Sequence, residues 1–472
     1  MEERELPPLW EHQSKAVRLC HDRDWFALFF EMGTGKTRTA IEIAITKFQK
    51  YSDVIPTIVF CPVVVVPNWH REWMEYSRIP HQHVVMLQGS QTERIERLLE
   101  APRNSILITN YESLVVMPRL FDALKAWGPK QIIFDESHRL KSSKAKRTRN
   151  AIALASQATY RWLLSGTPVL NSPMDLFSQY LAMDSGESFG KNFFAFRAKY
   201  FFDANSNMPS HIKFPDWQVK PKSIEKINQI VSETSMRVMK EECLDLPPLI
   251  KITRHCEMTD DQARMYRQMH KDFITYLKDK ACVAQLALTK ALRLQQIVSG
   301  FCKMEDGTEV SLSATPREEA LRELLEELTP NHKVIVWAVF KHNYKQIRKI
   351  LEDLKVGYVE VHGDVSEKDK QLAIERFNLD DTVRVYLGHT GSGGIGVNLT
   401  VSDYSIYFSR DFSLEHDLQS EARNHRGGSE QHKKITRIDL VTPETIDEVV
   451  LDKLAKKEEL GNTLISDLRG GV

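Results

Sequence analysis

The sequence has few cysteines, and none of them are closely paired. Its six cysteines (Cys20, Cys61, Cys243, Cys256, Cys282 and Cys302) include no CxxC spacing. This pattern argues against a zinc site and a disulfide framework and is typical of the reduced thiols of an intracellular protein. No apolar run approaches membrane-spanning length. The first residues, Met-Glu-Glu-Arg-Glu, do not resemble a signal peptide, so we expect an intracellular, soluble protein without a membrane partner.

The sequence also lacks net charge, because 64 Lys and Arg balance 64 Asp and Glu. A chain-wide coat of bound polyanion is therefore not expected, and any nucleic-acid contact must lie in a local groove. At 472 residues the chain is too long for one core, so two or three domains are expected. The 42% hydrophobic and 27% charged residues are ordinary for a globular protein.

Residues 31–37, Glu-Met-Gly-Thr-Gly-Lys-Thr, follow an apolar run and precede an amphipathic segment. A strand, a glycine-rich turn, Lys-Thr and a helix predict a phosphate-binding loop with Thr34 inside it. Gly33 and Gly35 would let backbone N–H groups approach the phosphates of ATP. Lys36 would reach the β- and γ-phosphates, and Thr37 would hold Mg²⁺. The alternative is a tight strand–helix connection without a ligand, since the strict pattern has glycine at the position of Phe30.

Short apolar runs recur at 57–61, 84–87, 105–109, 131–134 and 161–164, with helix-like segments between them. Runs that are apolar on both faces are typical of buried parallel strands. They predict a doubly wound α/β lobe over residues 1–171, with ligands at the carboxyl ends of its strands.

The run at 131–134 is followed by Asp135-Glu136-Ser137-His138. A carboxylate pair at a strand end suits nucleotide hydrolysis. Asp135 would hold Mg²⁺ through its water shell, and Glu136 would deprotonate the attacking water. The alternative is a solvated turn at the strand end without a catalytic role. The phosphate loop upstream, in a compatible fold, favours the catalytic interpretation over this one.

The pattern changes between residues 172 and 314, where we predict a helical insertion and interlobe linker with an aromatic core. A second parallel-sheet lobe is predicted over residues 315–472. Its strands are expected at 333–340, 358–361, 383–388, 404–408 and 435–440. A closing helix is expected at 445–460, and a simple C-terminal packing helix is equally consistent with the sequence.

The phosphate loop together with Asp135-Glu136-Ser137-His138 resembles the superfamily-two helicases. Further stretches resemble the Swi/Snf-type DNA translocases, and they are Asn68-Trp69 with Glu72, residues 163–171, residues 393–399, residues 417–419 and residues 423–426. This resemblance runs from about residue 9 to about residue 454. It implies two tandem RecA-like parallel-sheet lobes with ATP hydrolysed between them, in a compact bacterial or viral type of member. The sequence departs from the family at Gly391, where arginine is usual, and at residues 427–429.

The resemblance also assigns residue roles. Gln13 would read the adenine edge, and Arg423 and Arg426 would enter catalysis from the second lobe. The residues expected to couple ATP to movement are His138, Ser165, Gly166, Thr167, Gly394, Gly396 and Gln419. The residues expected to contact nucleic acid are Asn68, Trp69, Thr109, Asn110 and Asn398. Five basic residues between Lys141 and Arg149 fit either a phosphate contact or a solvated helix face.

We therefore predict an ATP-dependent translocase on double-stranded DNA, with single-stranded DNA or RNA a lesser expectation. It would work as a DNA-associated monomeric motor with ATP and Mg²⁺ as cofactors. Three alternatives stay open: a true unwinding DNA or RNA helicase, the motor subunit of a restriction or defence system with a nuclease or other protein partner, and an ATP-gated DNA clamp with little turnover.

Overall fold

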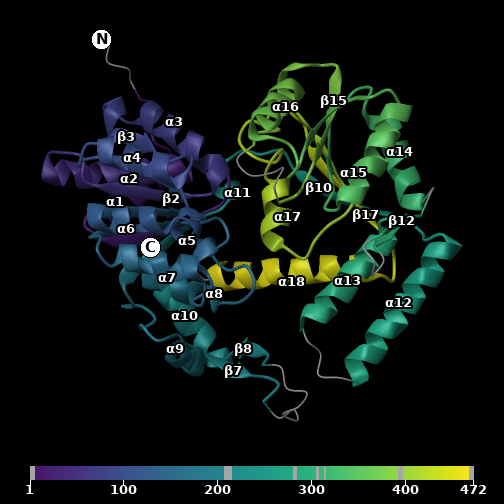
Figure 1. Ribbon diagram of the computed structural model, residues 1–472, viewed down its shortest axis with the longest axis horizontal. Helices are drawn as coiled ribbons and strands as arrows, with labels where there is room; N and C mark the ends of the chain where they lie inside the picture. Colours follow the sequence, from purple (N-terminus) through teal and green to yellow (C-terminus); the bar gives the residue numbers. More distant parts are fainter. Residues whose placement is uncertain are drawn as a thin grey trace. The chain divides into compact units, whose positions relative to one another are not determined.

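The structure is a computed structural model that describes residues 6–206, 215–279, 284–303, 308–312, 315–391 and 397–466. The chain divides into two compact units. Unit 1 comprises Met1–Phe202, Trp217–Leu244 and Lys457–Val472, and unit 2 comprises Asp203–Asp216 and Asp245–Lys456. Each unit contains one large parallel sheet, as Figure 1 shows. This confirms the predicted α/β fold with two tandem RecA-like lobes.

The sheet of unit 1 has seven parallel strands in the order β3-β4-β2-β5-β6-β1-β9. Their bounds are β1 (Trp25–Phe30), β2 (Thr57–Cys61), β3 (Val84–Met86), β4 (Ile106–Asn110), β5 (Gln131–Asp135), β6 (Tyr160–Leu164) and β9 (Ser235–Val238). The sequence predicts all of them except β9, a short edge strand whose two central residues are only partly buried.

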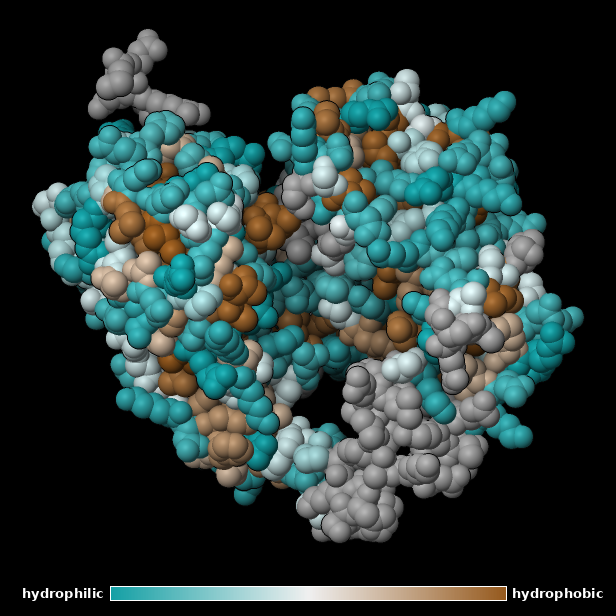
Figure 2. Space-filling view, viewed as in Figure 1, coloured by the Kyte–Doolittle hydropathy of each residue, from teal (hydrophilic) through white to brown (hydrophobic). Residues whose placement is uncertain are grey.

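Helices cover both faces of this sheet because successive side chains of each strand point to opposite sides. Phe26, Leu28 and Phe30 enter one core with α1 (Glu11–Cys20), α2 (Lys36–Tyr51) and α3 (Val66–Tyr76). Ala27 and Phe29 enter the other core. The helices on that side are α4 (Gln91–Glu100), α5 (Ser113–Val116), α6 (Pro118–Trp127), α7 (Lys146–Ala155), α8 (Asp175–Asp184), α9 (Phe193–Tyr200) and α10 (Pro221–Thr234). Figure 2 shows mainly hydrophilic surface over this unit, with separate apolar patches.

The sheet of unit 2 has six parallel strands in the order β10-β17-β16-β13-β15-β14. Their bounds are β10 (Leu249–His255), β13 (Val334–Trp337), β14 (Gly357–Val361), β15 (Val383–Gly388), β16 (Tyr404–Tyr407) and β17 (Ile435–Val441). The sequence predicts all except β10. That edge strand is exposed along nearly its whole length and lacks the continuous apolar run of a buried parallel strand.

Helices α14 (Pro316–Leu328) and α15 (Lys341–Asp353) pack on one face of this sheet, and α16 (Glu367–Leu379) packs on the other. The remaining helices are α11 (Lys240–Cys243), α12 (Asp260–Asp279), α13 (Ala284–Val298), α17 (Leu414–Glu421) and α18 (Ile446–Ser466). Two small sheets pair β7 (Phe201–Asp203) with β8 (Trp217–Val219), and β11 (Phe301–Lys303) with β12 (Glu309–Ser311). None of the described helices is both long and apolar enough to cross a membrane.

The predicted 172–314 insertion contributes residues to both compact units, Trp217–Leu244 to unit 1 and the segment from Asp245 onward to unit 2. Strand β9 completes the first sheet, and β10 pairs with β17 in the second. Phe196, Tyr200 and Phe201 are buried as expected, but they pack into the core of unit 1. A change from strand-rich to helix-rich sequence therefore does not mark a domain boundary here.

Lys47 is a fully buried lysine on α2. Its ammonium donates to the carbonyls of Cys20, His21 and Arg23 at 2.8, 2.6 and 2.8 Å. It also lies 5.1 Å from the centre of the Tyr160 ring. This one side chain therefore fastens the connection between α1 and β1 to the helix that carries the phosphate loop.

Lys47→Met is expected to lower the free energy of unfolding by about 1–3 kcal/mol, because it leaves buried carbonyls without a donor. Denaturant titration of the purified protein measures this loss. The matched control is Lys50→Met on the same helix, whose side chain is 38% exposed. A surface change of this kind shifts stability by about 0.5 kcal/mol or less. Equal stabilities for the two variants would contradict the assigned role of Lys47.

Candidate active site and nucleotide-binding centre

The predicted phosphate loop lies between β1 and α2. Gly33 and Gly35 have φ angles of 87° and 81°, in the left-handed region that glycine adopts without strain, and Gly35 caps α2. The Thr34 hydroxyl donates to the Glu31 carbonyl at 2.8 Å and fixes the turn. Backbone N–H groups at the start of α2 are thus presented at a helix N-terminus, which favours an anion.

Lys36 begins α2, and its ammonium donates to the carbonyls of Phe30 and Glu31 at 2.9 and 3.3 Å. The cation is therefore held over the loop itself, beside the helix N-terminus. Thr37 follows in the first helical turn. A cation, a hydroxyl and left-handed glycines in this arrangement fit a nucleotide phosphate chain with its divalent ion.

Gln13, the residue expected to read the adenine edge, lies beside the phosphate loop. Its Nε2 donates to the Gly35 carbonyl at 3.2 Å, and its Oε1 accepts from the Trp10 backbone N–H at 2.8 Å. His12 Nε2 lies 2.8 Å from the Thr34 carbonyl, a contact that the sequence analysis does not anticipate. Gln13 and His12 therefore anchor the start of α1 to the phosphate loop.

Asp135 is the last residue of β5, at the carboxyl edge of the sheet, and Glu136 follows it directly. Asp135 Oδ2 accepts from Trp69 Nε1 at 2.8 Å, and Oδ1 accepts from the Glu136 backbone N–H at 3.0 Å. The Asp135 carbonyl accepts from the Tyr111 hydroxyl at 2.7 Å. Burial, and then the neighbouring Glu136 carboxylate, raise the pKa of Asp135 to about 6. A divalent cation bound nearby would offset the free-energy cost of burying the ionised Asp135 carboxylate.

Glu136 has a φ of 51°, which is uncommon for a residue with a side chain and is a feature of functional turns. Its Oε2 is buried and accepts no hydrogen bond from the residues that the structure describes. His138 Nδ1 lies 3.4 Å from this oxygen. Glu136 therefore has a carboxylate oxygen available for a proton.

The predicted coupling residues of unit 1 form a chain of contacts. His138 Nδ1 also lies 3.2 Å from Ser165 Oγ, and that oxygen accepts from the Thr167 backbone N–H at 3.2 Å. Gly166 lies against the start of the phosphate loop, because a Cβ at this position would be 3.3 Å from the Phe30 carbonyl oxygen. The carboxylate pair and the loop are thus linked through residues 165–167.

The structure corrects two of the predicted nucleic-acid contacts. Trp69 is 1% exposed, and its indole N–H is committed to Asp135. Thr109 is fully buried and contacts Arg94 and Ser113. Both side chains are part of the interior of unit 1.

Asn68 is partly exposed and donates to Glu72 Oε1 at 2.8 Å. Asn110 is 7% exposed, accepts from Arg94 and donates to Glu112 Oε2 at 2.9 Å. Burial, and then the charge of Asp135, raise the pKa of Glu72 to about 7. Asn68 therefore remains the more accessible of the two asparagines.

The predicted residues of unit 2 lie on and after α17. Gln419 is buried on α17 and donates to Glu415 Oε1 at 3.3 Å. Arg423 is 5% exposed and donates to the Val397 carbonyl at 3.3 Å, whereas Arg426 is partly exposed. Asn398 is exposed. The structure places both arginines in the turns that follow α17, and Gly394 and Gly396 lie outside the described residues.

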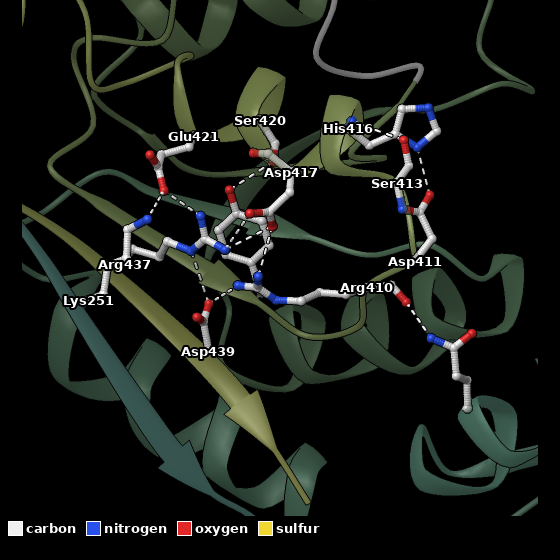
Figure 3. A network of polar contacts seen from close by, with 12 residues as sticks. Lys251, Arg410, Asp411, Ser413, His416, Asp417, Ser420, Glu421, Arg437 and Asp439 are labelled. Carbon is white, nitrogen blue, oxygen red and sulfur yellow. Dashed lines mark hydrogen bonds and ion pairs between the residues drawn. The ribbon is translucent and has the colours of Figure 1, made fainter. Parts of the chain in front are cut away.

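A buried charge network anchors α17 to the sheet of unit 2, and sequence reasoning misses it (Figure 3). Arg437 on β17 donates to Asp417 at 2.8 Å and also contacts Glu421 and Asp439. Arg410 donates to Asp417 at 2.8 Å and contacts Asp439. Burial acts to raise the pKa of Asp417, but Arg410 and Arg437 hold it below its ordinary value.

Lys251 on β10 completes this network by pairing with Glu421 at 2.8 Å. Two buried arginines and the half-exposed Lys251 therefore neutralise three carboxylates of unit 2. Removing one member would leave an uncompensated buried charge. The position of α17, and of the turns that carry Arg423 and Arg426, is fixed by these contacts.

Two family models match the chain. The model of the SNF2-related domain matches residues 12–305, and the helicase conserved C-terminal domain matches residues 316–428. The chain belongs to the SNF2-related family.

Several curated proteins resemble this SNF2-related chain. Chromodomain-helicase-DNA-binding protein 1-like from Mus musculus is 27% identical, over 95% of this chain and 49% of that protein. Its counterpart from Danio rerio is 26% identical, over 93% of this chain and 42% of that protein. The chain thus spans about half the length of these relatives or less. A solved Sulfolobus solfataricus SWI2/SNF2 ATPase core in complex with dsDNA is 24% identical, with a TM-score of 0.45, and covers 98% of this chain and 93% of that one.

Proposed function

We propose that this SNF2-related chain is an ATP-driven motor that moves along double-stranded DNA without sustained separation of the strands. The observation that carries the proposal is the connected centre of unit 1. A phosphate loop, a carboxylate pair and the 165–167 segment meet through Gly166, His138 and Ser165. The names of the curated relatives, which include helicase and DNA-binding, support nucleic acid as the track.

Each catalytic residue has a role that its surroundings support. Lys36, Thr37 and the backbone N–H groups of the loop would hold the phosphates, and Asp135 would orient Mg²⁺ through its water shell. The bound ion would neutralise charge that develops on the phosphate oxygens. Glu136 Oε2 would take the proton of the attacking water, and His138 Nδ1, 3.4 Å away, would help to orient this carboxylate.

Segment 165–167 connects the phosphate loop to His138 and Glu136, and this connection supports a role in coupling ATP hydrolysis to movement. Ser165 contacts His138 on one side and the Thr167 backbone on the other. A change in the phosphate loop, against which Gly166 packs, would reach the same contacts. A ligand shifts a conformational equilibrium only when it contacts the two conformations differently. We infer that ATP and its hydrolysis products make different contacts at the phosphate loop and so shift the position of segment 165–167.

ATPase turnover is expected to rise on addition of duplex DNA, and more than with single-stranded DNA or RNA. Duplex affinity is expected to fall steeply with salt, because contacts to the phosphate backbone release counterions. ATPase rates with duplex DNA, single-stranded DNA and RNA measure the stimulation. Binding isotherms at increasing salt, with duplexes of unrelated sequence, measure the duplex affinity. Affinity for ADP in the absence of DNA serves as the control for general effects of salt. Stimulation by RNA alone, or binding that depends on one base sequence, would contradict the proposal.

A further inference from the structure

Asp135 is held by two buried aromatic side chains from two different segments of unit 1. The Trp69 indole donates to its carboxylate at 2.8 Å, and the Tyr111 hydroxyl donates to its main-chain carbonyl at 2.7 Å. Trp69 lies on α3, which follows β2, and Tyr111 directly follows β4. Strand β2 pairs with both β4 and β5. The carboxylate and the backbone of Asp135 therefore have separate anchors at the carboxyl edge of the sheet.

Each aromatic residue directly follows an asparagine that is a candidate for nucleic-acid contact. Asn68 precedes Trp69 and lies on the partly exposed side of α3, where Arg71 donates to its side-chain oxygen Oδ1. Asn110 precedes Tyr111 and bonds to Glu112. Adjacent residues share a backbone, so a shift of either asparagine moves the aromatic donor beside it.

The segment around Tyr111 is also connected to basic side chains. Glu112 Oε1 accepts from Arg139 at 3.1 Å and lies 3.7 Å from Arg147, and both arginines are partly exposed. A phosphate that engages these guanidinium groups would compete with Glu112. Such competition would act on the segment that places the Tyr111 hydroxyl.

A tryptophan can be buried on α3 without a hydrogen bond from its indole N–H, so the contact between Trp69 and Asp135 is not explained by burial alone. Trp73 lies one turn further along α3 and is fully buried, yet its indole N–H has no hydrogen-bond partner within the described part of the chain. Trp69 could be buried in the same way, but its N–H ends on the carboxylate expected to orient the metal. Because only the Trp69 indole donates to Asp135, Trp69 has a positioning role in addition to packing, whereas Trp73 only packs.

We propose that Trp69 and Tyr111 are positioning residues that transmit nucleic-acid engagement of α3 and of segment 110–112 to the Asp135 carboxylate. The inference rests on the proposed function, because it needs a polyanion to bind those segments. Hydrogen-bond partners of a ligating carboxylate fix its orientation and tune its metal affinity. Coupling of this kind is reciprocal, so bound Mg²⁺-nucleotide would also change the affinity for DNA.

The test uses Trp69→Phe and Tyr111→Phe in the full chain, each of which removes one donor and keeps an aromatic ring. The matched controls are Trp73→Phe on the same helix and Tyr180→Phe, whose hydroxyl contacts Thr234 instead. Affinity for a fluorescent ADP is titrated with Mg²⁺, with and without duplex DNA, and again in EDTA. ATPase KM and kcat, and the melting temperature, are recorded for every variant.

Trp69→Phe is expected to raise the Mg²⁺ concentration for half-maximal binding by about 10-fold, the lower end of the effect of losing such a partner. Affinity in EDTA should stay at the wild-type level, because the phosphate loop is unchanged. In both test variants the effect of DNA on the Mg²⁺ requirement should be lost. Each substitution should also reduce the stimulation of kcat by DNA more than it alters KM. The two control variants should behave as wild type.

The outcomes separate the inference from the proposed function. If wild-type protein shows no effect of duplex DNA on turnover or on Mg²⁺ affinity, the proposed function itself fails. If wild type responds to DNA and both test variants respond as fully as Trp73→Phe, the inference alone is overturned. Should Trp69→Phe fail to fold, Tyr111→Phe decides between these results.

Discussion

Glu136→Gln is expected to lower ATP turnover by about 10²–10⁴-fold, the usual contribution of a general base, while ATP still binds. The amide keeps the size and polarity of the carboxylate but accepts no proton from water. Glu136 Oε2 is buried and lies 3.4 Å from His138 Nδ1. Glutamine at this position retains a polar contact to His138, so the loss should lie in the chemical step.

Nucleotide affinity and turnover are measured on the same preparation of Glu136→Gln. DNA affinity in the presence of ATP should be retained or increased, because the ATP-bound state accumulates. Glu100→Gln is the matched control, since Glu100 is exposed at the end of α4. Wild-type turnover in Glu136→Gln would place the general base on another residue.

The strands that position this centre are predictable from sequence because buried parallel strands are apolar on both faces. Every chemical motif of unit 1 lies at the end of such a strand, and the structure brings these ends to one edge of the sheet. The edge strands β9 and β10 are missed because they are short or exposed. Their pairing is decided by partners far away in the sequence, which local patterns do not report.

Residue roles were less predictable than strand positions. A sequence motif identifies Trp69, Thr109 and Gln13 as neighbours of a site, but not the direction in which each side chain points. The structure buries Thr109 and directs Trp69 and Gln13 to Asp135 and Gly35. A one-residue step along a helix turns the side chain by about 100°, so on α3 Asn68 is partly exposed whereas Trp69 is buried.

The charge network of unit 2 illustrates another limit. Its six ionic residues are scattered from Lys251 to Asp439 and follow no spacing that a motif would capture. Only the fold brings β10, α17 and β17 together. The network connects the sheet to the helix that leads into Arg423 and Arg426.

Arg426→Ala is expected to lower DNA-stimulated ATP hydrolysis by about 10³–10⁵-fold, the range over which an arginine acts on a departing phosphoryl group. The sequence between residues 245 and 456 contains no Gly-Lys-Thr or Gly-Lys-Ser stretch. A role of unit 2 in hydrolysis would therefore come from cationic side chains. Arg426 is partly exposed in the turn after α17, whereas Arg423 is 5% exposed and bonds to the Val397 carbonyl. Arg426 is thus the sharper test.

In the Arg426→Ala variant, nucleotide affinity and melting temperature should remain near wild type, because the phosphate loop lies in unit 1 and the anchors of α17 are intact. Arg376→Ala on α16 is the matched control, since that side chain is 57% exposed and pairs only loosely with Asp380. A loss of turnover with normal ATP affinity in Arg426→Ala, and normal turnover in Arg376→Ala, would assign the guanidinium to the transition state. Near-normal turnover in both variants would show that unit 2 does not supply catalysis through Arg426, and hydrolysis would then have to be completed by residues of unit 1 alone.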